Sequence, residues 1–287
     1  MADALASGAS VRKDVGVQVP PRAQVAGRIS FIKTLLHRLI SEYLTWLYNP
    51  LLSIYQKFFD LDRFRIKFAI SRSLRRLSDA YTSIRFLSIG SNDGFTDDPF
   101  VSQICRNEKI SASFIEPVPE VFDLLKSNYF AAVGKTSRLK FHQLAISDFS
   151  GSTIFYAVSP LAKDDLGRNL PKWFNQLGSF DRNHILKHLN GILEPFITEI
   201  KIDTRTLNDF LLEQGFEELD ILQIDAEGYD YKVMSTLDLT RFKPKLILIE
   251  HKHLNPEEKN QLKIKLTKIN YQLREFRSDL MATKLEN

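Results

Sequence analysis

The clearest chemical pattern in this sequence is a loop of two glycines around three polar residues: Gly90, Ser91, Asn92, Asp93 and Gly94. The loop follows an apolar run and precedes a helix that we expect to begin near Asp97, so backbone amides can approach a ligand closely. A loop that binds pyrophosphate prefers the pattern G-x-G-x-x-G, which is absent here. The carboxylate within this loop disfavours a pyrophosphate and suits a ligand that carries an ammonium group.

A second acid follows about two dozen residues later. Glu116 ends the apolar run 113–116 and precedes Pro117. In a doubly wound α/β fold, an acid at the tip of the second strand accepts hydrogen bonds from ribose hydroxyls. The alternative is a surface glutamate that caps the next helix. Together, the loop and this acid indicate a nucleoside ligand.

Two further apolar runs end in residues that could move a proton. Asp225 and Glu227 follow the run 221–224, and His251 follows the run 246–250. Such residues lie over the ligand crevice at the carboxyl edge of a sheet, where either type can accept a proton from an attacking hydroxyl. The alternative for His251 is a structural role. Because these carboxylates already have a use beside a cationic ligand, we expect no bound metal ion.

His184 and His188 are four residues apart, which places them on one face of a helix. This spacing is compatible with metal ligation, but no carboxylate accompanies them in the pattern of a zinc protease. Contact with a substrate, a place on the rim of a lid and simple surface exposure are the other interpretations.

The elements that must position these residues alternate along the chain after residue 83. Short apolar runs predict strands at 84–89, 113–116, 139–145, 221–225 and 246–250. Periodic segments predict helices at 119–129, 207–214, 229–237 and 256–269. This alternation is typical of an α/β fold with a doubly wound, mostly parallel, Rossmann-like sheet. We also expect a hairpin within 141–156 that turns at 148–151, and an insertion at about 158–198 that covers the ligand crevice.

The N-terminal part differs from the rest. Residues 1–28 predict a disordered tail or a mis-called start codon, because parts of this segment resemble a translated leucine transfer-RNA gene. Residues 29–82 predict a helical extension with an amphipathic helix over 29–59 and a basic helix over 63–80. The first helix is suited to peripheral membrane contact, to packing on its own domain or to forming a homodimer.

Composition narrows the class of protein. The chain has 287 residues, 44% of them hydrophobic, and its single cysteine excludes an intramolecular disulfide. Residues 1–85 carry 14 Lys and Arg against 6 Asp and Glu, which accounts for the net charge of +4. Anionic lipids, an acidic saccharide or solvated helix faces each explain this basic part, and we expect no nucleic-acid partner. The expected location is the cytoplasm, with membrane association through the N-terminal helix as an option.

Six segments in this order resemble the FkbM family of methyltransferases. They are SIGSNDG (88–94), IEP (115–117), AISD (145–148), DTRTL (203–207), IDAEG (224–228) and IEH (249–251). Within the insertion, residues 176–181 and 184–188 resemble a segment of one branch of that family. The resemblance identifies residues 83–287 as a methyltransferase domain of the class I type.

The resemblance implies a pocket for S-adenosyl-L-methionine. In that pocket the loop 90–94 surrounds the methionine end, Glu116 holds the ribose, and Ala145 and Ile146 flank the adenine. Many family members have Asp where this chain has Ser88, so the ammonium contact is expected at Asp93 or at backbone carbonyls.

The expected reaction is methylation of a hydroxyl on a sugar, polysaccharide or glycolipid, with Asp225, Glu227 or His251 as the base. The acceptor class comes from the family resemblance alone. Two alternatives stay open: a different doubly wound enzyme such as an NAD-dependent oxidoreductase, and a non-catalytic protein that binds adenosylmethionine.

Overall fold

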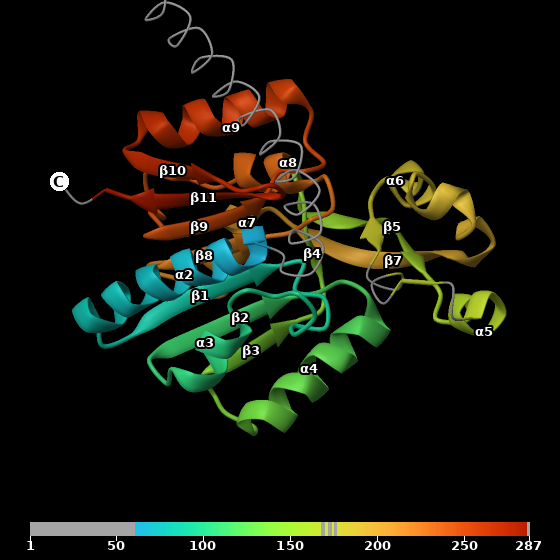
Figure 1. The fold of residues 1–287 in the computed structure, drawn as a ribbon, viewed down its shortest axis with the longest axis horizontal. Coiled ribbons are helices and arrows are strands. Elements are labelled where there is room, and N and C mark those ends of the chain that lie inside the picture. The colour runs from blue at the N-terminus through green and yellow to red at the C-terminus, as the bar shows by residue number, and fades with distance from the viewer. Residues whose placement is uncertain (1–60, 168–169, 172–173, 175–176, 286–287) are drawn as a thin grey trace, which may run out of the picture. The chain divides into compact units, whose positions relative to one another are not determined.

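A twisted sheet of seven strands forms the centre of the fold (Figure 1). In spatial order its strands are β10 (Tyr271–Glu275), β11 (Asp279–Lys284), β9 (Leu246–Glu250), β8 (Ile221–Ile224), β1 (Ile84–Ile89), β2 (Ile110–Ile115) and β3 (Leu139–His142). The strands from β9 to β3 pair in parallel, and β11 is antiparallel to both of its neighbours. The carboxyl ends of the parallel strands therefore share one edge, as the predicted fold class requires. The fold class is confirmed.

The computed structural model describes residues 61–167, 170–171, 174 and 177–285. The described residues belong to one compact unit, which begins at Leu61. The predicted tail at 1–28 and the predicted helix over 29–59 lie outside the described residues.

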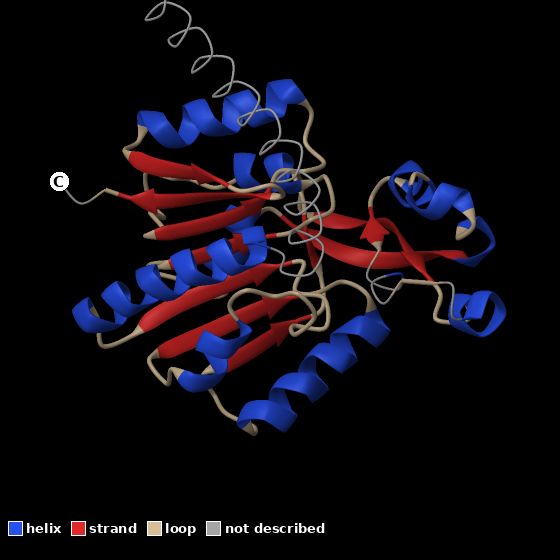
Figure 2. Ribbon diagram, viewed as in Figure 1, coloured by secondary structure: helices blue, strands red, loops and turns tan. Residues whose placement is uncertain are grey.

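Helices cover both faces of the sheet because its strands are apolar on both sides (Figure 2). Along β1, Leu87 and Ile89 belong to one core, and Ile84 and Phe86 belong to the other. The first core is completed by α7 (Leu207–Glu213), α8 (Asp230–Ser235) and α9 (Pro256–Lys268). The second is completed by α2 (Leu61–Ala80), α3 (Val101–Arg106) and α4 (Pro119–Val133). These layers hold the carboxyl edge of the sheet in a fixed position.

Helix α2 belongs to this core. Its residues Ile66, Ala69, Ile70 and Leu74 are buried at the helical spacing against the sheet. The sequence analysis places this helix in an N-terminal extension, but its apolar face packs within the same unit as the sheet.

A second, smaller sheet and the insertion form a lobe beside the main sheet (Figure 1). Its strands, in spatial order, are β4 (Ala145–Ile146), β7 (Ile197–Arg205), β5 (Gly151–Val158) and β6 (Gly178–Ser179). The helices of the lobe are α5 (Ala162–Leu166), α6 (Arg182–Leu186) and the 3-10 turns η3 (His188–Gly191) and η4 (Glu194–Phe196). A separate apolar cluster around Phe174 and Ile185 fills the lobe.

The predicted hairpin within 141–156 is wrong. β4 and β5 are not neighbours, because β7 lies between them and pairs with β5 from Gly151↔Thr204 to Val158↔Ile197. A partner strand whose paired residues are at least 39 positions away, as Val158 and Ile197 are, is not visible in the local pattern that suggests a turn at 148–151.

The helix after the glycine loop also begins later than predicted, at Val101. Asp97 has a left-handed φ of +63°, which a helix cannot contain. Asp98 then accepts hydrogen bonds from the amides of Phe100 and Val101, at 2.6 and 3.2 Å. Residues 91–100 therefore form an extended polar loop over the sheet edge.

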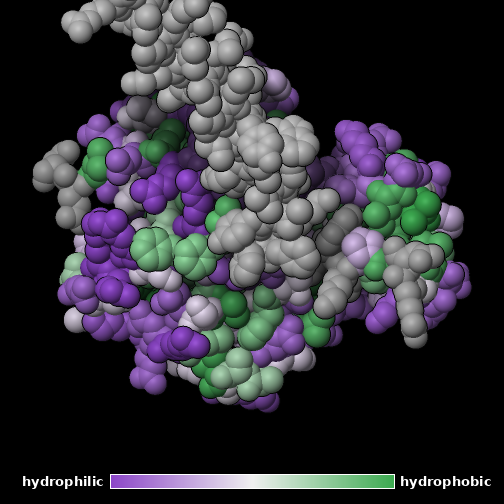
Figure 3. All heavy atoms as spheres, in the orientation of Figure 1, coloured by the Kyte–Doolittle hydropathy of each residue, from purple (hydrophilic) through white to green (hydrophobic). Residues whose placement is uncertain are grey.

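The face shown in Figure 3 carries both hydrophilic and hydrophobic residues, and a group of hydrophobic residues lies on the small lobe. Leu161 and Ile192 of the lobe are 64% and 44% exposed. Within residues 61–285 as described, no helix combines the length and apolar character that crossing a bilayer requires.

Candidate active site at the carboxyl edge of the sheet

The glycine loop is attached to both neighbouring strands. The amides of Gly90 and Ser91 donate to the carbonyl of Ile115 at 3.1 and 3.0 Å. Gly90 has a φ of +71°, and a Cβ placed there would lie 1.7 Å from the carbonyl oxygen of Asp225. Only glycine fits between β1 and β8 at this point, which explains why the first residue of the predicted loop is a glycine.

The polar residues of the loop serve its own backbone. The Ser91 hydroxyl donates to the carbonyl of Ser88 and accepts from the amide of Ile115, both at 3.1 Å. The Asp93 carboxylate accepts from the amides of Phe95 and Thr96, at 2.9 and 2.7 Å. Asp93 therefore stabilises the turn, and its carboxylate is engaged before any ligand contact.

Glu116 lies directly beside this loop. One of its carboxylate oxygens accepts from the amide of Asn92 and the other from the amide of Val118, each at 3.0 Å. Burial raises the pKa of Glu116 to about 7, although both amides oppose this shift. Glu116 therefore accepts a hydrogen bond from the N-terminus of α4 and also lies at the tip of β2. Each of its carboxylate oxygens has a lone pair left for another donor.

Three polar groups that the sequence analysis did not bring together lie beneath the loop. Ser88 and Gln223 are register partners on β1 and β8. The Ser88 hydroxyl and Gln223 Oε1 are buried, and neither has a hydrogen-bond partner in the described part of the chain. Gln223 also hydrogen-bonds to Asp98, whose pKa burial raises to about 6. The oxygen atoms of these three side chains can accept hydrogen bonds from a cationic group. They come together only when β1 pairs with β8.

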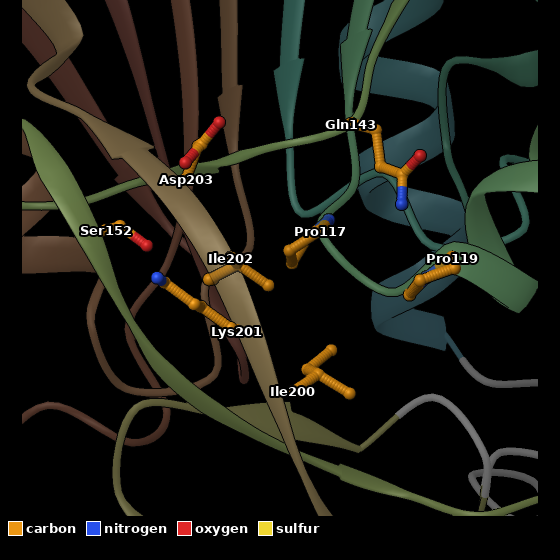
Figure 4. Close-up of a pocket in the computed structure, with 8 residues that line it drawn as sticks. All are labelled: Pro117, Pro119, Gln143, Ser152, Ile200, Lys201, Ile202 and Asp203. Atoms are coloured by element: carbon orange, nitrogen blue, oxygen red, sulfur yellow. The ribbon is translucent and has the colours of Figure 1, made fainter.

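Ala145 and Ile146 are both buried in the short strand β4, which pairs in parallel with β7. A cavity of about 280 Å³ lies between the second sheet and the loops after β2 and β3 (Figure 4). One of its lining residues, Gln143, is two residues before Ala145. Figure 4 shows the lining residues: Pro117, Pro119 and Gln143 from the loops, with Ser152 of β5 and the β7 residues Ile200, Lys201, Ile202 and Asp203.

Asp225 directly follows β8 at the same edge. Its Oδ1 is buried and has no hydrogen-bond partner among the residues that the structure describes. Burial, followed by the nearby charges of Glu250 and Glu227, raises the pKa of Asp225 well above its ordinary value. The structure therefore brings two of the predicted catalytic acids, Asp225 and Glu227, to one place.

Asp230, which the sequence analysis did not single out, shapes the turn that carries these acids. Its carboxylate accepts from the amides of Ala226 and Gly228, at 2.9 and 3.0 Å. Within this turn Glu227 takes a left-handed φ of +47°. Burial raises the pKa of Asp230 to about 7, with the amides of Ala226 and Gly228 opposing the shift.

His251 faces a different part of the molecule. Its Nε2 lies 3.0 Å from the carbonyl oxygen of Phe276, and its backbone amide donates to Ser278. The histidine that contacts Glu227 is His253, with Nε2 3.4 Å from Glu227 Oε2. His184 of the insertion lies at the same distance from the same oxygen. Neither of these contacts was predicted from spacing, since the residues come from three separate segments.

The sheet order and the glycine loop at its carboxyl edge define an α/β fold of the class I methyltransferase type. Residues 88–278 match the Methyltransferase FkbM domain, and the chain belongs to this family. The predicted family is confirmed.

Individual relatives share little sequence identity with this chain. The chain is 27% identical over 162 residues to the 2-O-methyltransferase NoeI of Sinorhizobium fredii (strain NBRC 101917 / NGR234). That match covers 54% of this chain and 60% of the relative.

Two solved structures are also similar. A methyltransferase FkbM from Methylobacillus flagellatus KT is 13% identical, with a TM-score of 0.43, over 70% of this chain and 44% of that one. CalS11, a TDP-rhamnose 3'-O-methyltransferase of calicheamicin biosynthesis, is 11% identical, with a TM-score of 0.39, over 93% and 95%.

The steric role of Gly90 can be tested against a second glycine. Gly134 also has a positive φ, +82°, but a Cβ there would meet nothing within 4 Å. We expect Gly134→Ala to lower the free energy of unfolding by about 1–3 kcal/mol, the cost of a backbone conformation with positive φ for a residue that has a Cβ. Gly90→Ala should lower it by at least about 1 kcal/mol more, because the new methyl group collides with the Asp225 carbonyl. Urea denaturation measures both values, and equal losses would contradict the close packing of β1 and β8.

Proposed function

We propose that this protein transfers a methyl group from S-adenosylmethionine to a hydroxyl oxygen. The observation that carries the proposal is the hydrogen bond from the Asn92 amide to Glu116, which joins the glycine loop of β1 to the acid at the tip of β2. A loop and an acid in this arrangement suit an adenosine whose ribose hydroxyls donate to the carboxylate. Membership of the FkbM methyltransferase family supports adenosylmethionine over a nicotinamide cofactor.

The amino acid end of the cofactor fits the polar group beneath the loop. The Ser88 hydroxyl, Gln223 Oε1 and the Asp98 carboxylate can each accept from an ammonium group, which carries three donors. Two of these acceptors have no partner within the described residues, and buried acceptors of this kind are usually satisfied. We therefore assign the ammonium contact to Asp98 with Ser88 and Gln223, rather than to Asp93, whose carboxylate holds the turn.

Bound adenosylmethionine supplies a methyl group that its sulfonium already activates. The protein has to align the acceptor with that methyl group and accept one proton. Of the three residues predicted as the base, Asp225 lies against Gly90 of the cofactor loop and has a carboxylate oxygen without a hydrogen-bond partner. We assign the contact with the acceptor hydroxyl to Asp225. Glu227 instead contacts histidines, and the His251 ring contacts Phe276.

For the acceptor we propose a sugar hydroxyl, on a saccharide or a glycolipid. The support is the similarity to a 2-O-methyltransferase, and 27% identity over part of the chain leaves the sugar itself to experiment. A non-catalytic protein that binds adenosylmethionine is the competing function, and only an activity assay separates the two.

Two variants separate the ribose contact from the ammonium contact. We expect Glu116→Gln to weaken binding of both adenosylhomocysteine and 5'-methylthioadenosine by about 10-fold, because both contain the ribose. Asp98→Asn should weaken adenosylhomocysteine by a similar factor and leave methylthioadenosine unchanged, since the latter has no amino acid group. Calorimetric titration measures all four affinities. If Asp98→Asn affects both ligands equally, the assignment of the ammonium contact is wrong.

The pKa of Glu116 predicts a pH dependence. The folded value of about 7 lies above the ordinary value of 4.5, so between these values the folded state binds more protons than the unfolded state. The contribution of Glu116 to stability therefore falls as pH rises through this window, while its ability to accept ribose hydroxyls increases. We expect affinity for methylthioadenosine to rise roughly 10-fold from pH 6 to pH 8, with the largest change near 7. Glu116→Gln should show no such rise in calorimetry, and a rise of the same size in this variant would contradict the prediction.

Activity tests the function directly. We expect methyl transfer from adenosylmethionine to a panel of saccharides, with NMR of the product showing the new methyl group on oxygen. Asp225→Asn should lower kcat by about 10²–10⁴-fold, the usual range for loss of a general base. Its affinity for adenosylhomocysteine serves as the control and should stay within about 3-fold. Unchanged kcat in this variant would remove Asp225 from the reaction.

A further inference from the structure

Three histidines and a glutamate converge where the insertion meets the main sheet. His184 lies in α6 and His188 begins η3, while Glu227 follows β8 and His253 follows β9. His184 Nε2 lies 3.4 Å from Glu227 Oε2 and 3.4 Å from His188 Nε2. His253 Nε2 also lies 3.4 Å from Glu227 Oε2. His184 and His253 thus contact the same Glu227 oxygen, and His188 contacts His184, so side chains from three separate segments meet here.

The spacing of these atoms matches the ligands of a metal ion. In a tetrahedral zinc site with bonds of 2.0–2.1 Å, neighbouring ligand atoms are about 3.3–3.4 Å apart. Three contacts in the cluster have this length. The nearest nitrogens of the three histidines lie within 4.8 Å of one another, and so do the nearest ligating atoms of His253, Glu227 and Glu250.

Hydrogen bonds satisfy this arrangement only weakly. His184 Nε2 faces both Glu227 Oε2 and His188 Nε2, each at 3.4 Å. In a neutral imidazole one nitrogen either donates or accepts, so His184 Nε2 has at most one proton to share between the two partners. A metal ion instead accepts a lone pair from every one of these atoms.

The backbone allows the two parts of the molecule to meet here. A Cβ on Gly228 would lie 3.5 Å from His253 Cβ and 3.7 Å from His184 Nδ1, so this glycine sits directly under the cluster. Asp181 caps α6 by accepting from the amide of Asn183, which fixes the start of the helix that carries His184. The side chains of His184, Glu227 and His253 are 12%, 22% and 23% exposed, which leaves an ion a path of entry.

We propose that His184, His188, His253 and Glu227 bind one divalent transition-metal ion and so connect the insertion to the carboxyl edge of the sheet. Three nitrogen donors and one oxygen donor suit Zn²⁺, and imidazole ligands disfavour Mg²⁺ and Ca²⁺. From the sequence, no bound metal ion is expected, because the carboxylates already have a use beside a cationic ligand and none accompanies His184 and His188 in the pattern of a zinc protease. Folding supplies one from residue 227.

The test uses full-length, untagged protein freed of metal by a chelator, with ZnCl₂ as the probe. Calorimetry in competition with a chelator should show one equivalent of Zn²⁺ bound per chain. His188→Ala and His253→Ala should each weaken binding by at least about 100-fold, beyond the 10–100-fold effect of changing an outer partner. Lys187→Ala, an exposed change on the same segment, is the matched control and should leave the affinity unchanged.

A second measurement guards against variants that fold poorly. Far-UV circular dichroism of the metal-free proteins should be the same for wild type and variants, and Zn²⁺ should raise the Tm of wild type and Lys187→Ala only. Absence of stoichiometric binding to wild type, or equal affinity in the histidine variants, would overturn the proposal. Because no methyl transfer is measured, this outcome is independent of the proposed function.

Discussion

The contact between β1 and β8 at their carboxyl ends determines the geometry of the whole edge. Gly90 lies so close to the Asp225 carbonyl that no side chain fits, and the Asp225 amide donates to the carbonyl of Ile89 at 3.0 Å. On the other side, Gly90 and Ser91 donate to Ile115. These backbone bonds hold the glycine loop between the strand tips that carry Glu116 and Asp225. The relative positions of the loop and both acids therefore follow from strand register rather than from flexible side chains.

Burial gives this edge its electrostatic character. Desolvation raises the pKa values of Glu116, Asp98 and Asp230, so this part of the edge contains acids that are only partly ionised near neutral pH in the free protein. A cationic ligand stabilises the ionised form of the acids that it touches, and its binding is coupled to their loss of protons. Ser88 in place of an acid fits this balance, because one more buried carboxylate beside Asp98 would increase repulsion.

The insertion brings a different chemistry to the same edge. His184 of the insertion contacts Glu227, which follows β8 of the main sheet, whereas the glycine loop and Glu116 follow β1 and β2 of that sheet. One edge thus carries an acceptor-rich group under the β1 loop and an imidazole-rich group beyond β8. Asp225 directly follows β8, two residues after Gln223 of the first group and two residues before Glu227, which the second group contacts.

Much of the sheet could be predicted from the sequence because its strands are continuous apolar runs. β1 and β9 have the predicted bounds, since most of their residues are apolar and each run stops at a glycine or a charged residue. β7, β10 and β11 were not predicted, because each is a short or alternating strand whose partner is distant or whose pattern is weak.

In the site, too, residues within one local motif could be predicted, whereas residues that strand pairing brings together could not. The loop 90–94 and Glu116 could be recognised because each is a local motif. Asp98 could not, since it meets Ser88 and Gln223 only after β1 pairs with β8. Likewise, the sequence alone does not tell whether His251 or His253 turns toward Glu227, because the choice depends on the loop after β9 and on the carbonyl of Phe276.

The most direct test of the central claim is a crystal structure of the protein with adenosylhomocysteine. The account predicts ribose hydroxyls within hydrogen-bond distance of the Glu116 carboxylate, with the amino group beneath the glycine loop near Ser88 and Asp98. A nucleoside bound elsewhere, or a ribose without contact to Glu116, would contradict it.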